Sequence, residues 1–501
     1  MELKNPQFDQ RHSNEGFLPD TEEHAASEQG ATTTGSIDSK TVDWDGPDDP
    51  ENPVNFSSLI KFTNVGIVSA LTFVSPLASS MFAPGVPQLM EEFHSSSTIL
   101  AGLVVSIYVL GFAVGPLILA PTSELLGRVI IYHICNIGFT IMTVACAVSS
   151  NLNMLIGFRF LQGCFGSAPV TNGGGTIADL IVQEKRGGVI AIYALGPLLG
   201  PVIGPVAGGY LTAAKGWRWT FLVLAIFGGF TTILSFLFLR ETYPTVLLKR
   251  KTQCLIKMTG QIDLRSMRDS GLSTRQLFVQ ALIRPCKILL LSPIVFVSSI
   301  YVGIVYGYQY LMFTTFTEIF EDQYGFPTKS SGLSYLGMGV GVLLGLFVIG
   351  AVSDQMIKKK SAQSGSMKPE YRLPPLVVGA FFIPAGLFLY GWSAYYKTHW
   401  MIPIIGTGLV GVGNIAAYMC ITSYLVDAFT IYAASALAAN TVMRSIIGAL
   451  LPLAGQSMYR AMGLGWGNSL LGFIAVACIP VPFAMIWYGE RMRMAFDVSR
   501  L

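Results

Sequence analysis

Twelve long apolar segments follow one another along this chain of 501 residues. Each is long enough to cross the roughly 30 Å hydrocarbon core of a bilayer. Inside that core a segment must satisfy its own backbone hydrogen bonds, which favours helices. Charged residues make up 12% of the chain, whereas soluble domains carry about 25%. We therefore predict an all-α membrane protein with spans near residues 60–84, 97–120, 129–150, 153–178, 188–212, 217–239, 288–315, 331–352, 374–395, 400–426, 433–458 and 464–488.

Charge is distributed unevenly along the chain, and it sets the expected orientation. Residues 1–58 hold 13 acidic and 3 basic residues without an apolar signal segment, so we expect a disordered acidic tail there. With the N-terminus in the cytosol, the inner loops and tails hold 25 Lys and Arg residues against 5 in the outer loops. The positive-inside rule then places both termini in the cytosol.

An internal repeat divides the spans into two halves. The segments "GFAVGPLILAPTSELLGR" (111–128) and "GVLLGLFVIGAVSDQMIK" (341–358) share two glycines, a serine, an acid and a base at a constant offset of 230 residues. Duplicated halves are typical of transporters whose substrate site lies between them near the membrane midplane. We predict two pseudo-symmetric six-helix halves in this division of the chain: a tail (1–58), an N-terminal half (59–239), a basic cytosolic linker (240–287), a C-terminal half (288–490) and a second cytosolic tail (491–501).

The chain resembles the fungal members of the major facilitator superfamily, in the group of twelve-span drug/proton antiporters. The resemblance covers about residue 44 to the C-terminus and is carried by the segments "WDGPDDPENPVNFS", "GPLILAPTSELLGR", "FRFLQGCFGSAP", "NGGGTIADL", "GWRWTF" and "YAASALAANTVMRSIIGALLPLAG". It implies the major facilitator fold, alternating access and export coupled to protons. These segments are specific for the family and weakly informative about the substrate.

A ladder of Gly-Pro steps, "GPLLGPVIGPVAGG" (196–209), interrupts the fifth span. The resemblance identifies it as the antiporter signature, with Gly200, Pro201, Gly204 and Pro205 as coupling residues. Its glycines recur every fourth residue and so share one helix face, where backbones can approach closely. We expect this face to seal against the span at 331–352, which carries "GMGVGVLLG". The alternative is a packing helix without a role in coupling.

Charged residues at the inner ends of the spans are expected to form a cytosolic gate. Arg128 begins the third span and Asp179 ends the fourth on the same side, so the two can pair. Glu124 is expected to lie against the N-terminus of a neighbouring helix, where the helix dipole favours an anion. Asp354 is its counterpart in the repeat and joins the gating residues. The alternative for Arg128 is ordinary positive-inside topology.

Arg159 and Arg444 lie inside spans, where a guanidinium is costly and needs a partner. The resemblance implies a role for Arg159 in coupling, and Arg444 is a candidate for substrate binding. For both, the alternative is a packing arginine that donates to backbone carbonyls. No acid lies in the middle of any span, so the sequence identifies no proton carrier.

Aromatic and amide side chains in the spans are the remaining candidates for substrate contact. Helical spacing places Tyr306, Tyr310 and Phe313 on one face, where their rings would bind a flat or amphiphilic molecule. The alternative is an aromatic belt at the membrane interface. Further polar candidates are Gln162, Asn414 and Asn440.

These features predict a monomeric plasma-membrane exporter of hydrophobic small molecules that exchanges them for protons. The dipeptide Gly-Lys of a nucleotide-binding loop is absent from the sequence, and the five histidines are far apart. We therefore expect no enzyme activity, cofactor, metal site or nucleic-acid partner. The alternatives are a proton-coupled importer of a small nutrient and a non-transporting membrane sensor, because the fold excludes neither.

Overall fold

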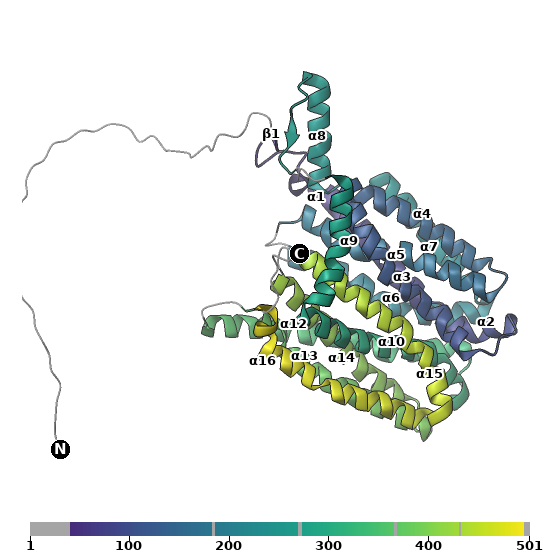
Figure 1. The fold of residues 1–501 in the computed structure, drawn as a ribbon. Helices are drawn as coiled ribbons and strands as arrows, with labels where there is room; N and C mark the ends of the chain where they lie inside the picture. The colour runs from purple at the N-terminus through teal and green to yellow at the C-terminus, as the bar shows by residue number, and fades with distance from the viewer. Residues whose placement is uncertain (1–40, 183–185, 269–272, 365–367, 430–431, 495–501) are drawn as a thin grey trace, which may run out of the picture.

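The computed structural model describes residues 41–182, 186–268, 273–364, 368–429 and 432–494, and they form a bundle of long helices (Figure 1). Ten helices among these residues are long and apolar enough to cross a membrane. The stretch Ala433–Met494 counts once among the ten, although it covers the last two predicted spans. The predicted fourth span, which carries Arg159 and Asp179, is helical but is not among the ten. The predicted all-α membrane architecture is confirmed.

The order of elements follows the predicted spans closely. The elements are β1 (Thr41–Val42), η1 (Pro53–Asn55), α1 (Ser58–Ser80), η2 (Ala83–Gly85), α2 (Val86–Glu92), α3 (Thr98–Leu126), α4 (Arg128–Ala147), α5 (Leu152–Leu180), α6 (Arg186–Lys215), α7 (Arg218–Phe238), α8 (Pro244–Thr259), β2 (Arg265–Ser266), α9 (Thr274–Leu291), α10 (Pro293–Tyr324), α11 (Thr328–Ser331), η4 (Gly332–Tyr335), α12 (Leu336–Ser364), η5 (Pro369–Arg372), α13 (Pro374–Tyr395), α14 (Met401–Phe429), α15 (Ala433–Cys478) and α16 (Pro480–Met494).

Local sequence signals set several helix boundaries. The hydroxyl of Ser97 accepts the Leu100 N–H at the start of α3, and Asn151 accepts the Met154 N–H at the start of α5. Gly127 has a φ of 103° and separates α3 from α4. Gly463, with a φ of 75°, breaks α15 between the last two predicted spans. Glycine adopts this left-handed region without steric cost.

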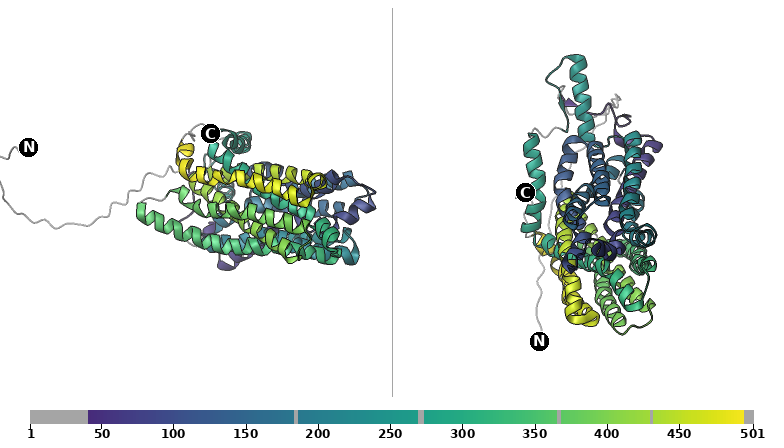
Figure 2. Two further views of the ribbon diagram at one scale, coloured as in Figure 1. Left: turned by 90° about the horizontal axis from the view of Figure 1, so that it is seen from below. Right: turned by 90° about the vertical axis from the view of Figure 1, so that its right-hand side faces the viewer.

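The two halves of the bundle meet most closely near one end. We call this end, where α2 lies, the α2 end, and the opposite end, where α8 and α9 lie, the linker end (Figures 1 and 2). The helices α3 and α15 pack along each other, and α6 packs on α11, η4 and α12. A methyl group on Gly332 would lie 2.4 Å from the Pro205 carbonyl oxygen, so α6 and η4 touch through their backbones. This contact closes the space between the halves toward the α2 end.

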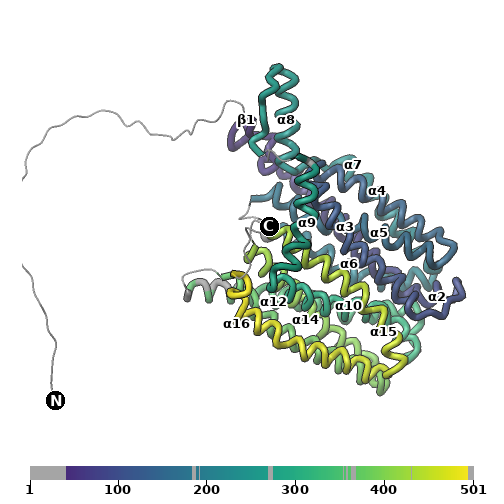
Figure 3. Tube along the Cα trace, viewed as in Figure 1, coloured from purple at the N-terminus to yellow at the C-terminus, as the bar shows by residue number. Residues whose placement is uncertain are grey.

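The predicted disordered tail is wrong for residues 41–57, which fold against the linker (Figure 3). Strand β1 pairs in parallel with β2 of the linker. The Lys251 ammonium of α8 lies 2.9 Å from a carboxylate oxygen of each of Asp45 and Asp49. Opposite charges in two segments that are far apart in the sequence therefore hold them together. Residues 1–40 lie outside the described part of the chain.

Candidate functional site: a central cavity and two charge clusters

A cavity of about 330 Å³ lies between the two halves. Helices α1, α3, α5 and α6 contribute one wall, and α10, η4, α12, α14 and α15 contribute the other. Most of its lining is apolar or aromatic. Pro197, Pro201 and Val202 come from the Gly-Pro ladder of α6, whereas Met338, Gly339 and Val342 come from α12. Apolar cavities with a few polar groups are typical of small-molecule sites.

Five of the seven predicted substrate residues line this cavity. They are Tyr306, Tyr310, Phe313, Asn414 and Arg444. Sequence reasoning missed Gln309, whose Oε1 accepts a 2.7 Å hydrogen bond from Asn414 Nδ2. A signal was available, because Gln309 is an amide inside a predicted span and follows Tyr306 by three residues, which places it near the aromatic face.

Arg444 reaches the cavity from α15 and lies between two aromatic rings. Its guanidinium carbon is 4.6 Å from the centre of the Tyr306 ring and 5.0 Å from that of Tyr418. The residue is 8% exposed. It is the one charged side chain among the described residues that line the cavity. Contacts with ring faces stabilise a cation partly, without neutralising its charge.

A chain of hydroxyl groups joins the two halves beside the cavity. Tyr310 Oη lies 3.1 Å from Ser79 Oγ of α1 and 3.4 Å from Tyr306 Oη. Ser79 belongs to α1 of the N-terminal half, and both tyrosines belong to α10 of the C-terminal half. The bond between Ser79 and Tyr310 therefore connects the two halves directly.

Arg159 does not line the cavity. It is fully buried in the N-terminal half, where it donates to the backbone carbonyls of Val104 at 3.2 Å, Ala78 at 2.9 Å and Ser79 at 3.3 Å. Its Nη1 also lies 3.2 Å from Gln162 Oε1. The geometry matches the alternative of a packing arginine that donates to carbonyls.

Two predicted substrate residues are buried away from the cavity. Gln162 donates to Thr143 Oγ1 at 2.8 Å and accepts from Arg159. Asn440 lies 3.3 Å from Ser299 Oγ and is 3% exposed. Both amides therefore satisfy buried polar groups between helices. Their sequence position in a span does not reveal which side of the helix they occupy.

The Gly-Pro ladder seals against α1, and the prediction that it seals against the span at 331–352 is wrong. A methyl group on Gly200 would lie 2.8 Å from the Leu77 nitrogen of α1. A methyl group on Gly204 would lie 2.5 Å from Ser80 Oγ of the same helix. The glycines of α12 instead pack mostly on α14, since a methyl group on Gly341 would lie 1.9 Å from the Gly408 carbonyl oxygen. Another face of α6 meets α12, where Val202 contacts Gly339.

The predicted pair of Arg128 and Asp179 is present at the linker end. Arg128 Nε lies 3.5 Å from Asp179 Oδ2, and both side chains are at least 86% buried. Arg128 also donates to Ser123 Oγ at 2.7 Å. The Tyr243 ring lies 4.9 Å from the guanidinium carbon. The arginine therefore links α3, α4, α5 and the segment after α7.

Glu241, which sequence reasoning missed, occupies the N-terminus of α4. Its carboxylate accepts the Arg128 N–H at 3.0 Å and the Val129 N–H at 3.2 Å. It also accepts the N–H groups of Thr242 and Tyr243, each at 3.0 Å. An acid at a helix N-terminus is favoured by the dipole and by unpaired N–H groups. We predicted a contact of this kind for Glu124, but Glu241 makes it.

The C-terminal half repeats this arrangement. Arg372 of η5, before α13, forms an ion pair with Asp427 near the end of α14. The Glu370 carboxylate lies 3.3 Å from Arg493 Nε of α16. A basic residue thus lies at or just before the start of the third helix of each half and pairs with an acid near the end of the fourth. The second cluster was not predicted because the local sequence around Arg372 lacks the pattern seen at Arg128.

The other two predicted gating acids, Glu124 and Asp354, are not part of the ion pairs described above. The Glu124 side chain is exposed near the end of α3, and no hydrogen bond to it occurs among the described residues. Asp354 lies on α12, and its side chain lies outside the part of the chain that the structure describes. Their gating roles remain predictions.

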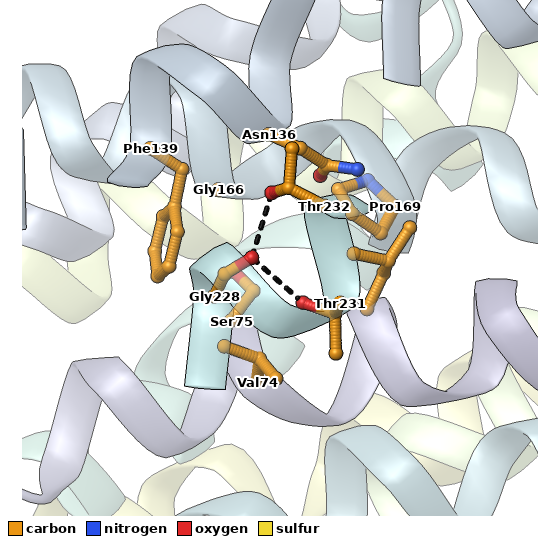
Figure 4. A pocket seen from close by; sticks show the side chains of 10 residues that line it. Val74, Ser75, Asn136, Phe139, Gly166, Pro169, Gly228, Thr231 and Thr232 are labelled. Carbon is orange, nitrogen blue, oxygen red and sulfur yellow. Dashed lines mark hydrogen bonds between the residues drawn. The ribbon is translucent and has the colours of Figure 1, made fainter. Parts of the chain in front are cut away.

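A second, much smaller gap lies inside the N-terminal half (Figure 4). Its volume is about 10 Å³, and Ser75, Asn136 and Thr231 are among its polar neighbours. The Asn136 Nδ2 is buried without a hydrogen-bond partner in the described residues. A space of this size is close to the minimum that one water molecule needs, so it cannot admit a substrate.

Comparisons with known proteins agree with this architecture. The family model described as Major Facilitator Superfamily matches residues 68–452. The chain is 77% identical over 483 residues to the "MFS-type transporter tndD" of Aspergillus flavipes, which covers 95% of this chain and 90% of that protein. It is 52% identical over 458 residues to the "Efflux pump radE" of Floropilus chiversii, with 91% and 85% covered.

Solved structures share the fold at low sequence identity. The xylose transporter XylE from E. coli, in a "partially occluded inward open conformation", matches with a TM-score of 0.63 at 15% identity, over 85% of this chain and 97% of XylE. A bacterial homologue of the human lysosomal transporter Spinster, "in inward-facing and unoccupied conformation", matches with a TM-score of 0.62 at 13% identity, over 88% of this chain and 100% of that one.

Proposed function

This chain belongs to the major facilitator superfamily, and we propose that it exports small hydrophobic or amphiphilic molecules from the cytosol by alternating access. The observation that carries the proposal is the 330 Å³ cavity between two halves that touch near the α2 end. A relative with 52% identity is named an efflux pump, which favours export. We propose that the substrate is a secondary metabolite or drug and that the protein works as a monomer in the plasma membrane.

In this scheme the α2 end faces outward and the linker end faces the cytosol. The structure then corresponds to an inward-facing state, since the halves meet through Pro205 and Gly332 at the α2 end. Rocking of the halves would break that contact and the bond between Ser79 and Tyr310. The clusters around Arg128 and Arg372 would shift against each other at the cytosolic end.

Exchange for protons forms part of the proposal and depends on the family resemblance. No carboxylate lines the cavity among the described residues. Asp179 is the acid of the predicted gate that lies in a buried ion pair. Coupling through that pair would require its protonation to loosen the contact with Arg128, which is consistent with a gate at the cytosolic end.

Flux in inside-out plasma-membrane vesicles tests the proposal. The vesicles come from a fungal strain that lacks its own exporters, and the compounds are a panel of radiolabelled neutral and acidic aromatic molecules. We expect uptake into an acidified lumen, loss of uptake with a protonophore, and no uptake in vesicles without the protein. Uptake only in right-side-out vesicles would identify an importer, and binding without flux would identify a sensor. Either result would reject export.

A further inference from the structure

The two arginines inside the bundle have very different surroundings. Arg159 is fully buried and makes hydrogen bonds to three backbone carbonyls and to Gln162. Arg444 is 8% exposed, and its Nε is buried without a hydrogen-bond partner in the described residues. Its guanidinium lies against the rings of Tyr306 and Tyr418, and the Tyr418 side chain is also a hydrogen-bond partner of the guanidinium. The fold therefore supplies acceptors to Arg159, whereas Arg444 keeps one buried donor, Nε, without an acceptor.

An unpaired guanidinium inside a bundle is costly unless a partner of opposite charge approaches it. None of the described residues that line the cavity is acidic. Ring faces attract a cation but provide no acceptor atom, and the Nε–H of Arg444 has no acceptor among the described residues. A ligand in the cavity can supply an acceptor for Arg444 Nε, because the Arg444 side chain lines that cavity.

We propose that the cavity recognises aromatic or alicyclic molecules that carry one anionic oxygen group, such as a carboxylate or an ionised phenol or enol. Arg444 would bind the anionic group through charge-assisted hydrogen bonds. Phe313 and the proline face around Pro201 would contact the apolar body. This inference rests on the proposed transport function, because it names the substrate class for that cavity.

The remaining lining supports one anionic group and an apolar body. The amides of Gln309 and Asn414 already bond to each other at 2.7 Å, so they are partly satisfied without a ligand. Tyr306 and Tyr418 flank the guanidinium, and both residues also line the cavity. The volume of about 330 Å³ lies at the lower end of small-molecule sites. A compact acid fits this arrangement better than a peptide or a sugar polymer.

Neutral analogues should bind poorly, because they leave the guanidinium unpaired. A site built around a buried polar group discriminates strongly against a ligand that cannot pair with it. We therefore expect 2-naphthoate, which is ionised at neutral pH, to bind at least about tenfold more tightly than 2-naphthamide, which has the same ring system and no charge.

Thermal unfolding of the purified full-length protein in detergent tests the inference without requiring transport. Each probe is titrated onto the wild type, and the unfolding midpoint is recorded. We expect a concentration-dependent increase with 2-naphthoate and little change with 2-naphthamide, since a ligand that binds the folded state raises its stability. Equal responses to the two probes, or no response to either, would overturn the inference.

The two arginines supply a matched pair of variants. Arg444→Met should leave the midpoint of the empty protein unchanged or higher and abolish the preference for 2-naphthoate, because it removes an unpaired buried charge. Arg444→Lys should keep a weaker preference, since lysine retains the charge without the planar fork. Arg159→Met should lower the midpoint, because it leaves three backbone carbonyls without their donor. If Arg444→Met lowered the midpoint as far as Arg159→Met, Arg444 would be structural and the inference would be wrong.

The vesicle assay separates failure of this inference from failure of the proposed function. Selective binding of 2-naphthoate without any flux would keep the anion site and reject export. Export of neutral and acidic compounds at equal rates would keep export and reject recognition through Arg444.

Discussion

Gly208→Ala places a methyl group where α6 and α1 touch through their backbones. The added carbon would lie 1.8 Å from the Met81 carbonyl oxygen. Ordinary non-bonded contacts are roughly 3.5 Å, so the two helices must separate locally by more than about 1 Å. Because the obstacle is backbone, a change of rotamer cannot relieve the clash. The separation would also loosen the neighbouring contacts at Gly204 and Gly200.

The expected cost follows from the balance of two effects. Overpacking of a tight interface costs about 1–3 kcal/mol. Replacing glycine by alanine inside a helix recovers about 1 kcal/mol of helix propensity. Gly66→Ala on α1 is the matched control, because a methyl group there meets nothing within 4 Å. It should therefore gain stability, whereas the overpacking at Gly208→Ala should offset or exceed the same gain, for a difference of roughly 1–3 kcal/mol between the variants.

Thermal unfolding midpoints of both variants, purified in the same detergent, provide the measurement. We expect Gly208→Ala to unfold at a lower temperature than Gly66→Ala, and Gly66→Ala to unfold at the same temperature as wild type or a higher one. Uptake into inside-out vesicles should fall in Gly208→Ala alone, because α6 lies at the contact between the halves. If both variants matched wild type in stability and flux, close backbone packing of α6 on α1 would not contribute to stability as argued.

Three further predictions address the gates and the tail. Arg128→Ala and Asp179→Ala should each impair efflux, and exchanging the two charges should restore part of it; strictly additive losses in the double-mutant cycle would show that the pair is not coupled. Tyr310→Phe should remove the hydrogen bond to α1 and favour opening of the α2 end by about 0.5–1.5 kcal/mol, measured as faster labelling of cysteines introduced there; unchanged labelling would contradict a role in closure. Burial raises the pKa of the Asp49 carboxyl, but hydrogen bonds from a neighbouring backbone N–H and from Lys251 lower it by more, so the net pKa lies below its usual value. A lowered carboxyl pKa adds stability above the unfolded-state pKa and loses it as pH falls through the folded-state value. Proteolysis of residues 41–57 should therefore be slow at neutral pH and accelerate in acid, and Lys251→Met should accelerate it already at neutral pH; cleavage independent of both would exclude docking through this pair.

Sequence alone determined the class of fold and the path of the chain through the bundle. Apolar length forces helices in a bilayer, and glycine, serine and asparagine set their ends locally, as at Gly127, Ser97 and Asn151. The pair of Arg128 and Asp179 was also predictable, because both residues lie at helix ends on one side of the membrane. These are properties of single helices or of their order.

Tertiary structure decided which helix face meets which neighbour. The Gly-Pro ladder predicts a close helix contact, but several helices carry small residues that could form the other side of it. In the folded bundle the partner is α1. Arg159 and Arg444 are both arginines inside apolar spans, so the sequence does not distinguish them. The helix face on which each lies decides that Arg159 contacts backbone carbonyls and Arg444 lines the cavity. The role of Glu241 has no local sequence pattern, because the two α4 N–H groups that it accepts lie more than 100 residues earlier in the chain. Periodicity places residues on a common face, but only the assembled bundle determines what that face contacts.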